Sequence, residues 1–235
     1  MPAEPAYWAI VPAAGSGSRM GAALPKQYLR LGDRTVLEHT LDTLLAIDAI
    51  SGVLLVVAPG DNAWQSIQPR YSGQPVDVVD GGAERCHSVL NALDALAGKA
   101  AASDWVLVHD AARPCVRRDD IRALMESVAA GSDGGLLGVQ VADTMKRVAA
   151  DGRVSATVDR AGLWHALTPQ MFRLEALRAA LRQAIAADSL VTDEASAMEL
   201  AGYRPLMVQG HRDNIKITLP ADLALAAFYL QAGQQ

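Results

Sequence analysis

Three short runs of consecutive apolar residues limit the possible folds of this chain more than any other feature. They lie at 8–11, 53–58 and 105–108, and none alternates apolar with polar residues. A strand with one face in water alternates, so an unbroken apolar strand is covered on both faces. Helical periodicity at 36–46 and 84–96 separates these runs. The pattern predicts an α/β, Rossmann-like fold with a mostly parallel central sheet and helices on both faces.

The remaining segments fit one domain over 1–235 with a projecting hairpin. Residues 76–79, 205–208 and 214–218 are further predicted strands, and Pro220 opens a predicted last helix at 221–231. An Asp-Gly turn at 151–152 joins two polar strands, which is typical of a hairpin. This hairpin buries little by itself. We therefore interpret 142–167 as a dimerisation arm, with a surface hairpin that has no partner as the alternative.

Composition excludes several classes of protein. Of 235 residues, 51% are hydrophobic and 20% charged, which is ordinary for a folded globular chain. The formal net charge of −5 argues against nucleic acid as a partner, and no run reaches the ~20 apolar residues that span a bilayer. Two isolated cysteines and a start without an export signal predict a cytoplasmic location.

A glycine-rich loop follows the first apolar run. It contains Gly15, Gly17 and Arg19, and Lys26 lies seven residues further on. Glycines let backbone N–H groups approach phosphate oxygens, and two cations suit a triphosphate. The spacing matches neither a P-loop nor a dinucleotide fingerprint, since Met20 stands where the latter needs glycine. The alternative is an ordinary turn with solvated cations.

Two more polar segments follow predicted strands. The pair Gly81-Gly82 precedes Ser88 at a helix start and could bind a base edge or simply cap the helix. Asp110 follows a buried strand, where a carboxylate needs a cation partner or a metal ion such as Mg²⁺. An Asp110–Arg113 ion pair that shapes the loop is the alternative. We expect the neighbouring histidine, His109, to be a hydrogen-bonded structural residue.

These segments together resemble a known enzyme family. The matching strings run in order from residue 10 to the last helix, and they cover nearly the whole chain. They are Pro12-Ala-Ala-Gly-x-Gly-x-Arg19-Met with Pro25-Lys-Gln-Tyr28, Asp80-Gly-Gly-x-x-Arg-x-x-Ser88, Val108-His-Asp-Ala-Ala-Arg-Pro114, Asp143-Thr-Met-Lys146, Val158-Asp-Arg160, Leu163-Trp-His-Ala-Leu-Thr-Pro-Gln170, Thr192-Asp-Glu-Ala-Ser196 and Asp213-Asn-Ile-Lys216. The chain is similar to the 2-C-methyl-D-erythritol 4-phosphate cytidylyltransferases.

The resemblance implies roles for individual residues. The residues expected to act on the phosphates in catalysis are Arg19, Lys26, Arg160 and Lys216. Those expected to bind the nucleotide are Ala13, Ala14, Gly15, Gly81, Gly82 and Ser88. Those expected to bind the methylerythritol phosphate are Asp110, Arg113, Thr144, Thr168 and Thr192. Thr144 and Arg160 would reach the active site of a neighbouring subunit, which implies a homodimer. Ala83 departs from relatives that carry a polar or acidic residue there, which leaves the base contacts at that position open.

The implied reaction is an attack by a phosphate-monoester oxygen on the α-phosphorus of CTP with loss of pyrophosphate. Mg²⁺ or another divalent cation is the expected cofactor, and whether Asp110 contacts the metal or the substrate stays open. Three alternatives remain: a ribitol or ribulose 5-phosphate cytidylyltransferase, a catalytically silent nucleotide-binding protein, and a hexose-phosphate nucleotidyltransferase. Residues that bind the acceptor distinguish between the possible substrates. Release of pyrophosphate distinguishes an enzyme from a silent nucleotide-binding protein.

Overall fold

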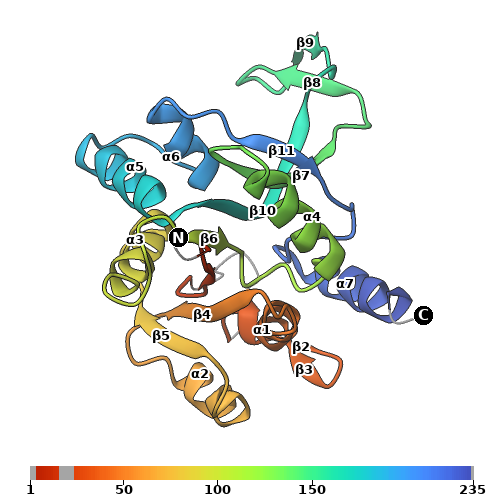
Figure 1. The fold of residues 1–235 in the computed structure, drawn as a ribbon. Coiled ribbons are helices and arrows are strands. Elements are labelled where there is room, and N and C mark those ends of the chain that lie inside the picture. The colour runs from red at the N-terminus through yellow and green to blue at the C-terminus, as the bar shows by residue number, and fades with distance from the viewer. Residues whose placement is uncertain (1–3, 16–23, 234–235) are drawn as a thin grey trace.

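A seven-stranded sheet forms the centre of residues 4–15 and 24–233, the part of the chain that the computed structural model describes (Figure 1). The strand order across it is β11-β7-β10-β6-β1-β4-β5. The strands are β1 (Tyr7–Pro12), β4 (Ile50–Val57), β5 (Val76–Asp80), β6 (Trp105–Val108), β7 (Gly134–Gln140), β10 (Trp164–Arg173) and β11 (Leu206–Gln209).

The sheet is parallel except at one strand. β1 pairs in parallel with β4 and β6, and Ile10 lies in register with both Leu54 and Val108. β10 runs antiparallel to its two neighbours, β6 and β7. This arrangement confirms the predicted mostly parallel sheet.

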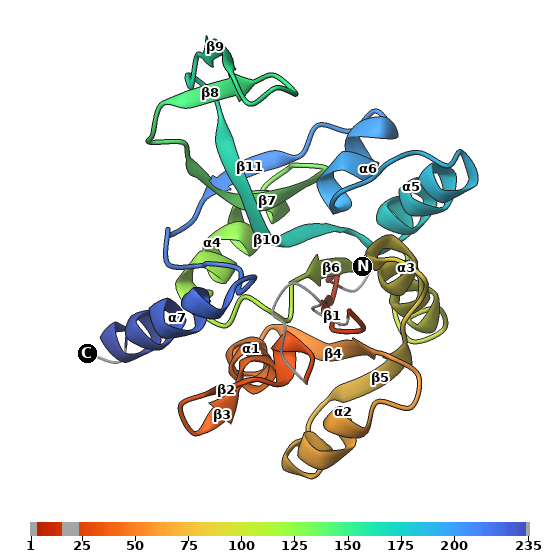
Figure 2. The same cartoon turned by 180° about the vertical axis from the view of Figure 1, so that it is seen from behind.

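Helices cover both faces of the sheet, as Figures 1 and 2 show from opposite sides. Neighbouring residues in the central strands point to opposite faces, so Ile10 and Val11 pack in different cores. One core includes α1 (Val36–Leu45), α2 (Asn62–Ile67) and α4 (Arg118–Ala129). The other includes α3 (Arg85–Ala95), α5 (Leu174–Ala186) and α6 (Glu194–Leu200). The continuous apolar runs therefore do have two buried faces.

Local signals explain where several helices begin. Thr35 and Glu38 form a capping box at the start of α1, and Asp193 with Ser196 forms another at α6. Pro220 occupies the first turn of α7 (Pro220–Ala232), where a missing N–H costs nothing. α7 packs in a small third core with Ile217 and with the short strand β2 (Arg30–Leu31), which pairs with β3 (Arg34–Thr35).

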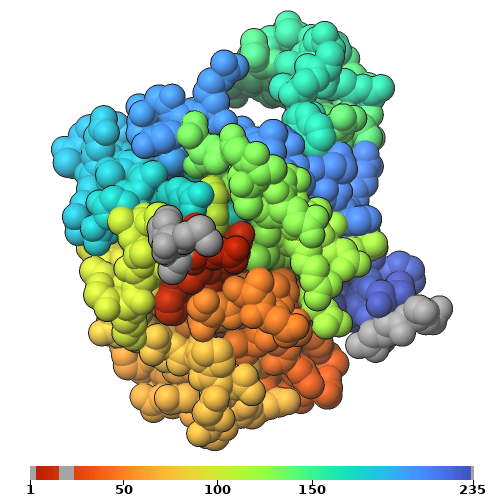
Figure 3. Space-filling model, in the orientation of Figure 1, coloured from red at the N-terminus to blue at the C-terminus, as the bar shows by residue number. Residues whose placement is uncertain are grey.

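The predicted hairpin projects from the rest of the molecule (Figures 1 and 3). It consists of β8 (Met145–Val148) and β9 (Val154–Val158), and Gly152 in the turn has a φ of 81°. Nearly all of its residues are exposed, including 54% of Val148 and 61% of Val154. The hairpin is confirmed, but the predicted segment 142–167 also contains the first residues of β10, which belong to the central sheet.

One predicted strand was wrong. Residues 214–218 alternate apolar and polar side chains, yet they form no strand in the described structure. Their backbone instead bonds to the loop after β6, where Ile217 N donates to Ala112 O at 2.8 Å. Arg113 also donates to the Asn214 carbonyl at 2.8 Å. Within the described residues, no helix has the length and apolar content needed to cross a membrane.

Candidate active site

A cavity of about 360 Å³ opens at the carboxyl ends of β1, β5 and β6. Ligands of open parallel sheets bind at this edge, so the location agrees with the prediction from the sequence. Its lining comes from the loops after these strands, from the segment after β11, and from the short helix η2 (Lys26–Tyr28). The residues are Pro12, Ala13, Ala14, Gly15, Lys26, Gln27, Gly82, Ala83, Glu84, Arg85, Ser88, Asp110, Ala111, Ala112, Lys216 and Thr218.

Two glycines allow close packing after β5. A Cβ on Gly81 would lie 2.3 Å from the Cβ of Ala14 in the loop after β1, and one on Gly82 would lie 2.4 Å from the Cβ of His87 in the first turn of α3. Both distances are shorter than real side chains allow, so a larger residue at Gly81 would push the two loops apart, and one at Gly82 would displace the start of α3. Gly82 N also donates to the buried Ser88 hydroxyl at 3.1 Å. This part of the wall is therefore built from close backbone contacts, which suits recognition of a flat base edge.

A buried glutamine holds residues 13–15, the described start of the first loop. Gln27 is only 4% exposed, and its amide donates to Ala13 O at 2.5 Å and to Gly15 O at 3.0 Å. These two hydrogen bonds fix the path of residues 13–15 along the cavity. Lys26 precedes Gln27 and lies in the cavity wall.

Three cations surround the carboxylate of Asp110. Its Oδ1 accepts from Arg85 Nε at 3.2 Å, and its Oδ2 accepts from Arg113 Nε at 3.3 Å and lies 2.9 Å from Lys216 Nζ. Burial alone raises the pKa of the Asp110 carboxyl. The charges of Arg85, Lys216 and Arg113 outweigh burial and hold that pKa well below its usual range. Asp110 is therefore ionised at neutral pH, and it places Lys216 at the cavity.

Arg85 links this carboxylate to a second, more deeply buried one. Its Nη1 and Nη2 donate to the two oxygens of Glu194 at 2.6 and 3.0 Å, and Glu194 is 1% exposed. Burial lowers the pKa of the Arg85 guanidinium, but Glu194 and Asp110 more than reverse this and raise it. The Arg85–Glu194 ion pair joins the start of α3 to the start of α6, although the two residues lie 109 positions apart in the sequence.

Behind Asp110, a chain of hydrogen bonds fixes His109 in its neutral form. The Asp110 N–H donates to Thr168 Oγ1 at 3.1 Å, and that hydroxyl lies 3.0 Å from His109 Nδ1. His109 Nε2 lies 3.1 Å from the Arg113 carbonyl, which can only accept, so this nitrogen carries the proton. Burial lowers the pKa of His109 to about 4. The expectation of a structural histidine is confirmed.

The surroundings of Asp110 do not fit a direct magnesium ligand. Both of its oxygens already accept from cationic groups, and a divalent ion there would have to displace Arg85, Arg113 or Lys216. The other buried carboxylate nearby, Glu194, is held by Arg85 at both oxygens. This geometry favours the ion-pair alternative for Asp110. It is also compatible with the expected role of Asp110 in binding the substrate.

The chain matches known proteins over almost its full length. A family model described as 2-C-methyl-D-erythritol 4-phosphate cytidylyltransferase matches residues 7–232. This chain belongs to that family. A relative of that name from Hahella chejuensis is 56% identical over 97% of this chain and 94% of its own, and one from Tolumonas auensis is 51% identical over 96% of both. The resemblance inferred from the motifs is confirmed.

Solved structures agree with this assignment. A crystal structure of a 4-diphosphocytidyl-2C-methyl-D-erythritol synthase superposes with a TM-score of 0.84 at 39% identity, covering 97% of this chain and all of the other. A 2-C-methyl-D-erythritol 4-phosphate cytidylyltransferase from Francisella tularensis gives a TM-score of 0.81 at 35% identity, covering 95% and 99%. The fold described above is therefore the fold of the family.

Of the residues predicted from the family motifs, the structure brings only some to the cavity. The predicted residues that line the cavity are Ala13, Ala14, Gly15, Lys26, Gly82, Ser88, Asp110 and Lys216. Gly81, Arg113 and Thr168 lie directly behind the wall and touch its members. Thr192 is exposed before α6, and its N–H donates to Ser196 Oγ at 3.1 Å. Arg19 lies outside the described residues.

Thr144 and Arg160 lie on the arm. Both are exposed, and neither lines the cavity within the described part of the chain. Arg160 donates to the carbonyl of Ala142 across the base of the hairpin. Among residues 4–15 and 24–233, no contact brings these two side chains to the cavity of their own chain.

The motif analysis assigned no role to several residues that shape the site. Gln27, Arg85 and Glu194 are half-buried or buried and hold the loops, while the Asn214 amide donates to Thr168 O at 2.8 Å. Each occurs inside a string that matches the family, and a buried polar residue needs partners. That rule points to Arg85, which follows two glycines at a predicted helix start. It does not identify Glu194 as the partner.

Proposed function

We propose that this protein transfers a cytidylyl group from CTP to 2-C-methyl-D-erythritol 4-phosphate, giving 4-CDP-2-C-methyl-D-erythritol and pyrophosphate for isoprenoid precursor synthesis. The observation that carries this proposal is the cavity at the strand ends. Its wall combines close-packed glycine loops with the ammonium groups of Lys26 and Lys216. Membership of the cytidylyltransferase family supports the choice of nucleotide and acceptor.

The reaction depends on positioning the two substrates and neutralising their negative charges more than on a general base. The acceptor is a phosphate monoester whose second pKa is about 6, so its attacking oxygen is already anionic at neutral pH. That oxygen forms a bond to the α-phosphorus as the bond to the β-phosphate bridging oxygen breaks, and pyrophosphate leaves with the electron pair. The neutral, buried His109 is not needed as a base. Lys26 and Arg19 are proposed to stabilise the negative charge that gathers around the α-phosphorus, while Lys216 and Arg160 are proposed to hold the acceptor phosphate.

We propose that the divalent cation of the reaction, Mg²⁺ or another, is carried by the CTP phosphates and not by Asp110. Magnesium sites commonly combine substrate phosphates with few protein ligands. Asp110 instead serves to place Lys216 and Arg113 on the acceptor side of the cavity. Removal of metal with EDTA should abolish turnover. In Asp110→Asn, turnover should fall while the Mg²⁺ concentration for half-maximal rate stays unchanged; a large rise in that concentration would return the metal to Asp110.

We propose that the protein is a homodimer in which the arm of one subunit closes the cavity of the other. Thr144 and Arg160 are exposed on the arm, as are the apolar side chains of Met145, Val148 and Val154. In a dimer these apolar groups would be covered, and Arg160 would bind the acceptor phosphate. In this proposal the second copy supplies the arm residues of the site, since no arm residue lines the cavity of its own described chain.

A cytoplasmic location completes the proposal. Cys86 and Cys115 are both free thiols, which fits a reducing compartment. Cell fractionation of a tagged chain tests the location, and recovery in an extracytoplasmic fraction would refute it.

Pyrophosphate release tests the activity. The protein is supplied with Mg²⁺ and each pairing of CTP, UTP, ATP or GTP with methylerythritol 4-phosphate, ribitol 5-phosphate or glucose 1-phosphate. The proposal expects release only with CTP and methylerythritol 4-phosphate. Release with ribitol 5-phosphate would keep the mechanism and change the substrate. Binding of CTP without release from any pair would identify a silent nucleotide-binding protein.

A further inference from the structure

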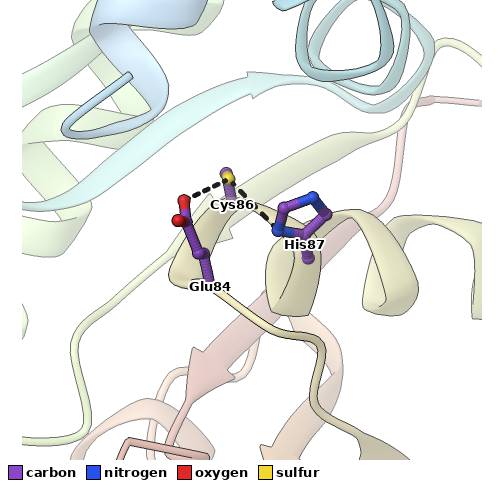
Figure 4. Close-up of side chains that lie close together, drawn as sticks. All are labelled: Glu84, Cys86 and His87. Atoms are coloured by element: carbon purple, nitrogen blue, oxygen red, sulfur yellow. Dashed lines mark hydrogen bonds between the residues drawn. The ribbon is translucent and has the colours of Figure 1, made fainter. Parts of the chain in front are cut away.

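The start of α3 gathers three side chains of the kinds that bind transition-metal ions. Glu84, Cys86 and His87 each offer one ligand atom, and these atoms all lie within 4.8 Å of one another. The Cys86 sulfur is 3.9 Å from Glu84 Oε2 and 3.7 Å from His87 Nδ1. In Figure 4 the sulfur lies between the carboxylate and the imidazole ring. One carboxylate, one thiol and one imidazole therefore converge at a single point.

The spacing of these atoms agrees with a tetrahedral ion. With a Zn–S bond of about 2.3 Å and Zn–N or Zn–O bonds of about 2.1 Å, tetrahedral angles place the sulfur about 3.6 Å from each other ligand. The two distances from the Cys86 sulfur exceed this value by only a few tenths of an ångström. Small rotations of exposed or half-buried side chains would complete the geometry.

Other roles do not occupy these ligands. Glu84 stands at the N-cap of α3, but its side chain makes no capping hydrogen bond. The guanidinium of the intervening Arg85 turns to Asp110 and Glu194, so it does not neutralise Glu84. Within the described part of the chain, the hydrogen-bond partner of the Glu84 carboxylate is the Cys86 thiol. A cation could therefore replace a weak contact without breaking a strong one.

We propose that Glu84, Cys86 and His87 bind one borderline-soft divalent transition ion of the Zn²⁺ class. Binding releases the Cys86 thiol proton, and a water molecule fills the fourth position. The thiolate and imidazole select this class over Mg²⁺, which prefers oxygen ligands only. Glu84 lines the cavity, and the Cβ of His87 packs against Gly82. The ion would thus lie at the edge of the nucleotide cavity, at a place separate from the phosphate-bound magnesium proposed above.

Titration of the reduced, metal-free full chain with Co²⁺ tests the site without any assay of activity. A thiolate ligand gives a near-ultraviolet charge-transfer band that carboxylate and imidazole alone do not. We expect this band to saturate at one Co²⁺ per chain, to be bleached by Zn²⁺, and to survive an excess of Mg²⁺. Cys86→Ser should abolish it. Glu84→Gln and His87→Gln should each weaken Co²⁺ binding by at least the roughly 10–100-fold that loss of an outer-shell partner costs.

Two control variants give this test its specificity. Cys115→Ser removes the other cysteine, whose thiol is buried and whose pKa burial raises to about 12, and His165→Gln removes an exposed histidine on β10. Both should keep the band and its stoichiometry. No band in the wild-type chain, a band that persists in Cys86→Ser, or its displacement by Mg²⁺ would overturn the proposal.

Discussion

Charged residues are buried and paired at the cavity but exposed to solvent on the arm. At the cavity, Asp110 in the wall and Glu194 behind it are both buried, and Arg85 binds both of them. On the arm, Arg160 is exposed and donates to the carbonyl of Ala142 at the base of its own hairpin. A buried charge requires paired partners to be tolerated, whereas an exposed one does not. The ion pairs at the cavity are therefore formed within the single chain, whereas the arm presents its charged residues to solvent.

The apolar residues show the same contrast. Side chains around the strand ends are covered on both faces of the sheet, while Met145, Val148 and Val154 on the arm are at least a third exposed. These exposed groups contribute less to the stability of the single chain than fully buried ones do, because less of their apolar surface is removed from water. Changes in the cavity should therefore alter the folding or the chemistry of each subunit, and changes in the arm should alter only assembly and the shared site.

Breaking the buried ion pairs should have the largest effect. Arg85→Met leaves Glu194 without its cation, so we expect the free energy of unfolding to fall by about 3–5 kcal/mol. Urea denaturation at pH 7 measures it. Arg182→Met is the matched control because Arg182 pairs with Asp94 on the surface, and its cost should stay below about 1 kcal/mol. Equal losses in the two variants would show that burial of the Arg85 cluster does not matter.

Removing a cation from the cavity wall should damage the chemistry while sparing the fold. Lys26→Ala should lower kcat by about 10²–10³-fold, the usual cost of one group that stabilises the transition state. Lys99→Ala is the control, since Lys99 pairs with Asp77 on the surface, and it should leave kcat unchanged. Near-normal turnover in Lys26→Ala would exclude the proposed role.

The buried His109 should make stability depend on pH. Its pKa is about 4 in the folded chain and about 6.5 in the unfolded chain, so the unfolded chain binds more protons between these values. Stability is full above pH 6.5 and declines as the pH falls. Between pH 6.5 and 5, the wild type should lose up to about 1.4 kcal/mol more per pH unit than His109→Gln. Parallel curves in urea denaturation would contradict this.

A charge placed on the arm should act only on assembly. Val154→Asp would bury a carboxylate in the proposed interface, and we expect the dimer dissociation constant to rise about tenfold, or about 1.4 kcal/mol. Sedimentation as a function of concentration measures this constant. Arg153→Ala, a change to the neighbouring exposed residue, is the control. An unchanged dissociation constant in Val154→Asp would place the dimer contact elsewhere.

The sequence predicted individual strands and turns better than the contacts between them. The apolar runs identified β1, β4 and β6, and the Asp-Gly turn identified the arm. β7 was missed because it contains Gly134, Gly135 and Gly138, which disfavour strands; a Cβ at these positions would collide with Phe172, Leu206 and Met207. β10 was also missed, and its antiparallel direction could not have been predicted in any case, because periodicity carries no information on strand order.

In the site, too, the sequence predicted individual loops better than contacts between distant segments. Loops after strands indicated Gly15, Gly82 and Asp110, because each lies near the end of a predicted strand. The bond between Arg85 and Glu194 spans 109 residues, and no local pattern indicates such a pairing. The segment 214–218 looked like a strand because Ile215 and Ile217 alternate with polar residues. Its backbone instead bonds to the loop after β6, which brings Lys216 to Asp110.

Complementation between two inactive variants tests most directly whether one subunit's arm completes the other's cavity. Lys26→Ala impairs the cavity and Arg160→Ala impairs the arm, so each homodimer should be nearly inactive. The two chains are co-expressed with different tags, and the mixed dimer is purified through both tags. In a two-fold symmetric dimer with shared sites, the mixed species holds one intact cavity facing one intact arm, which predicts about half of the wild-type pyrophosphate release. Activity no higher than that of the parent homodimers would contradict the shared site.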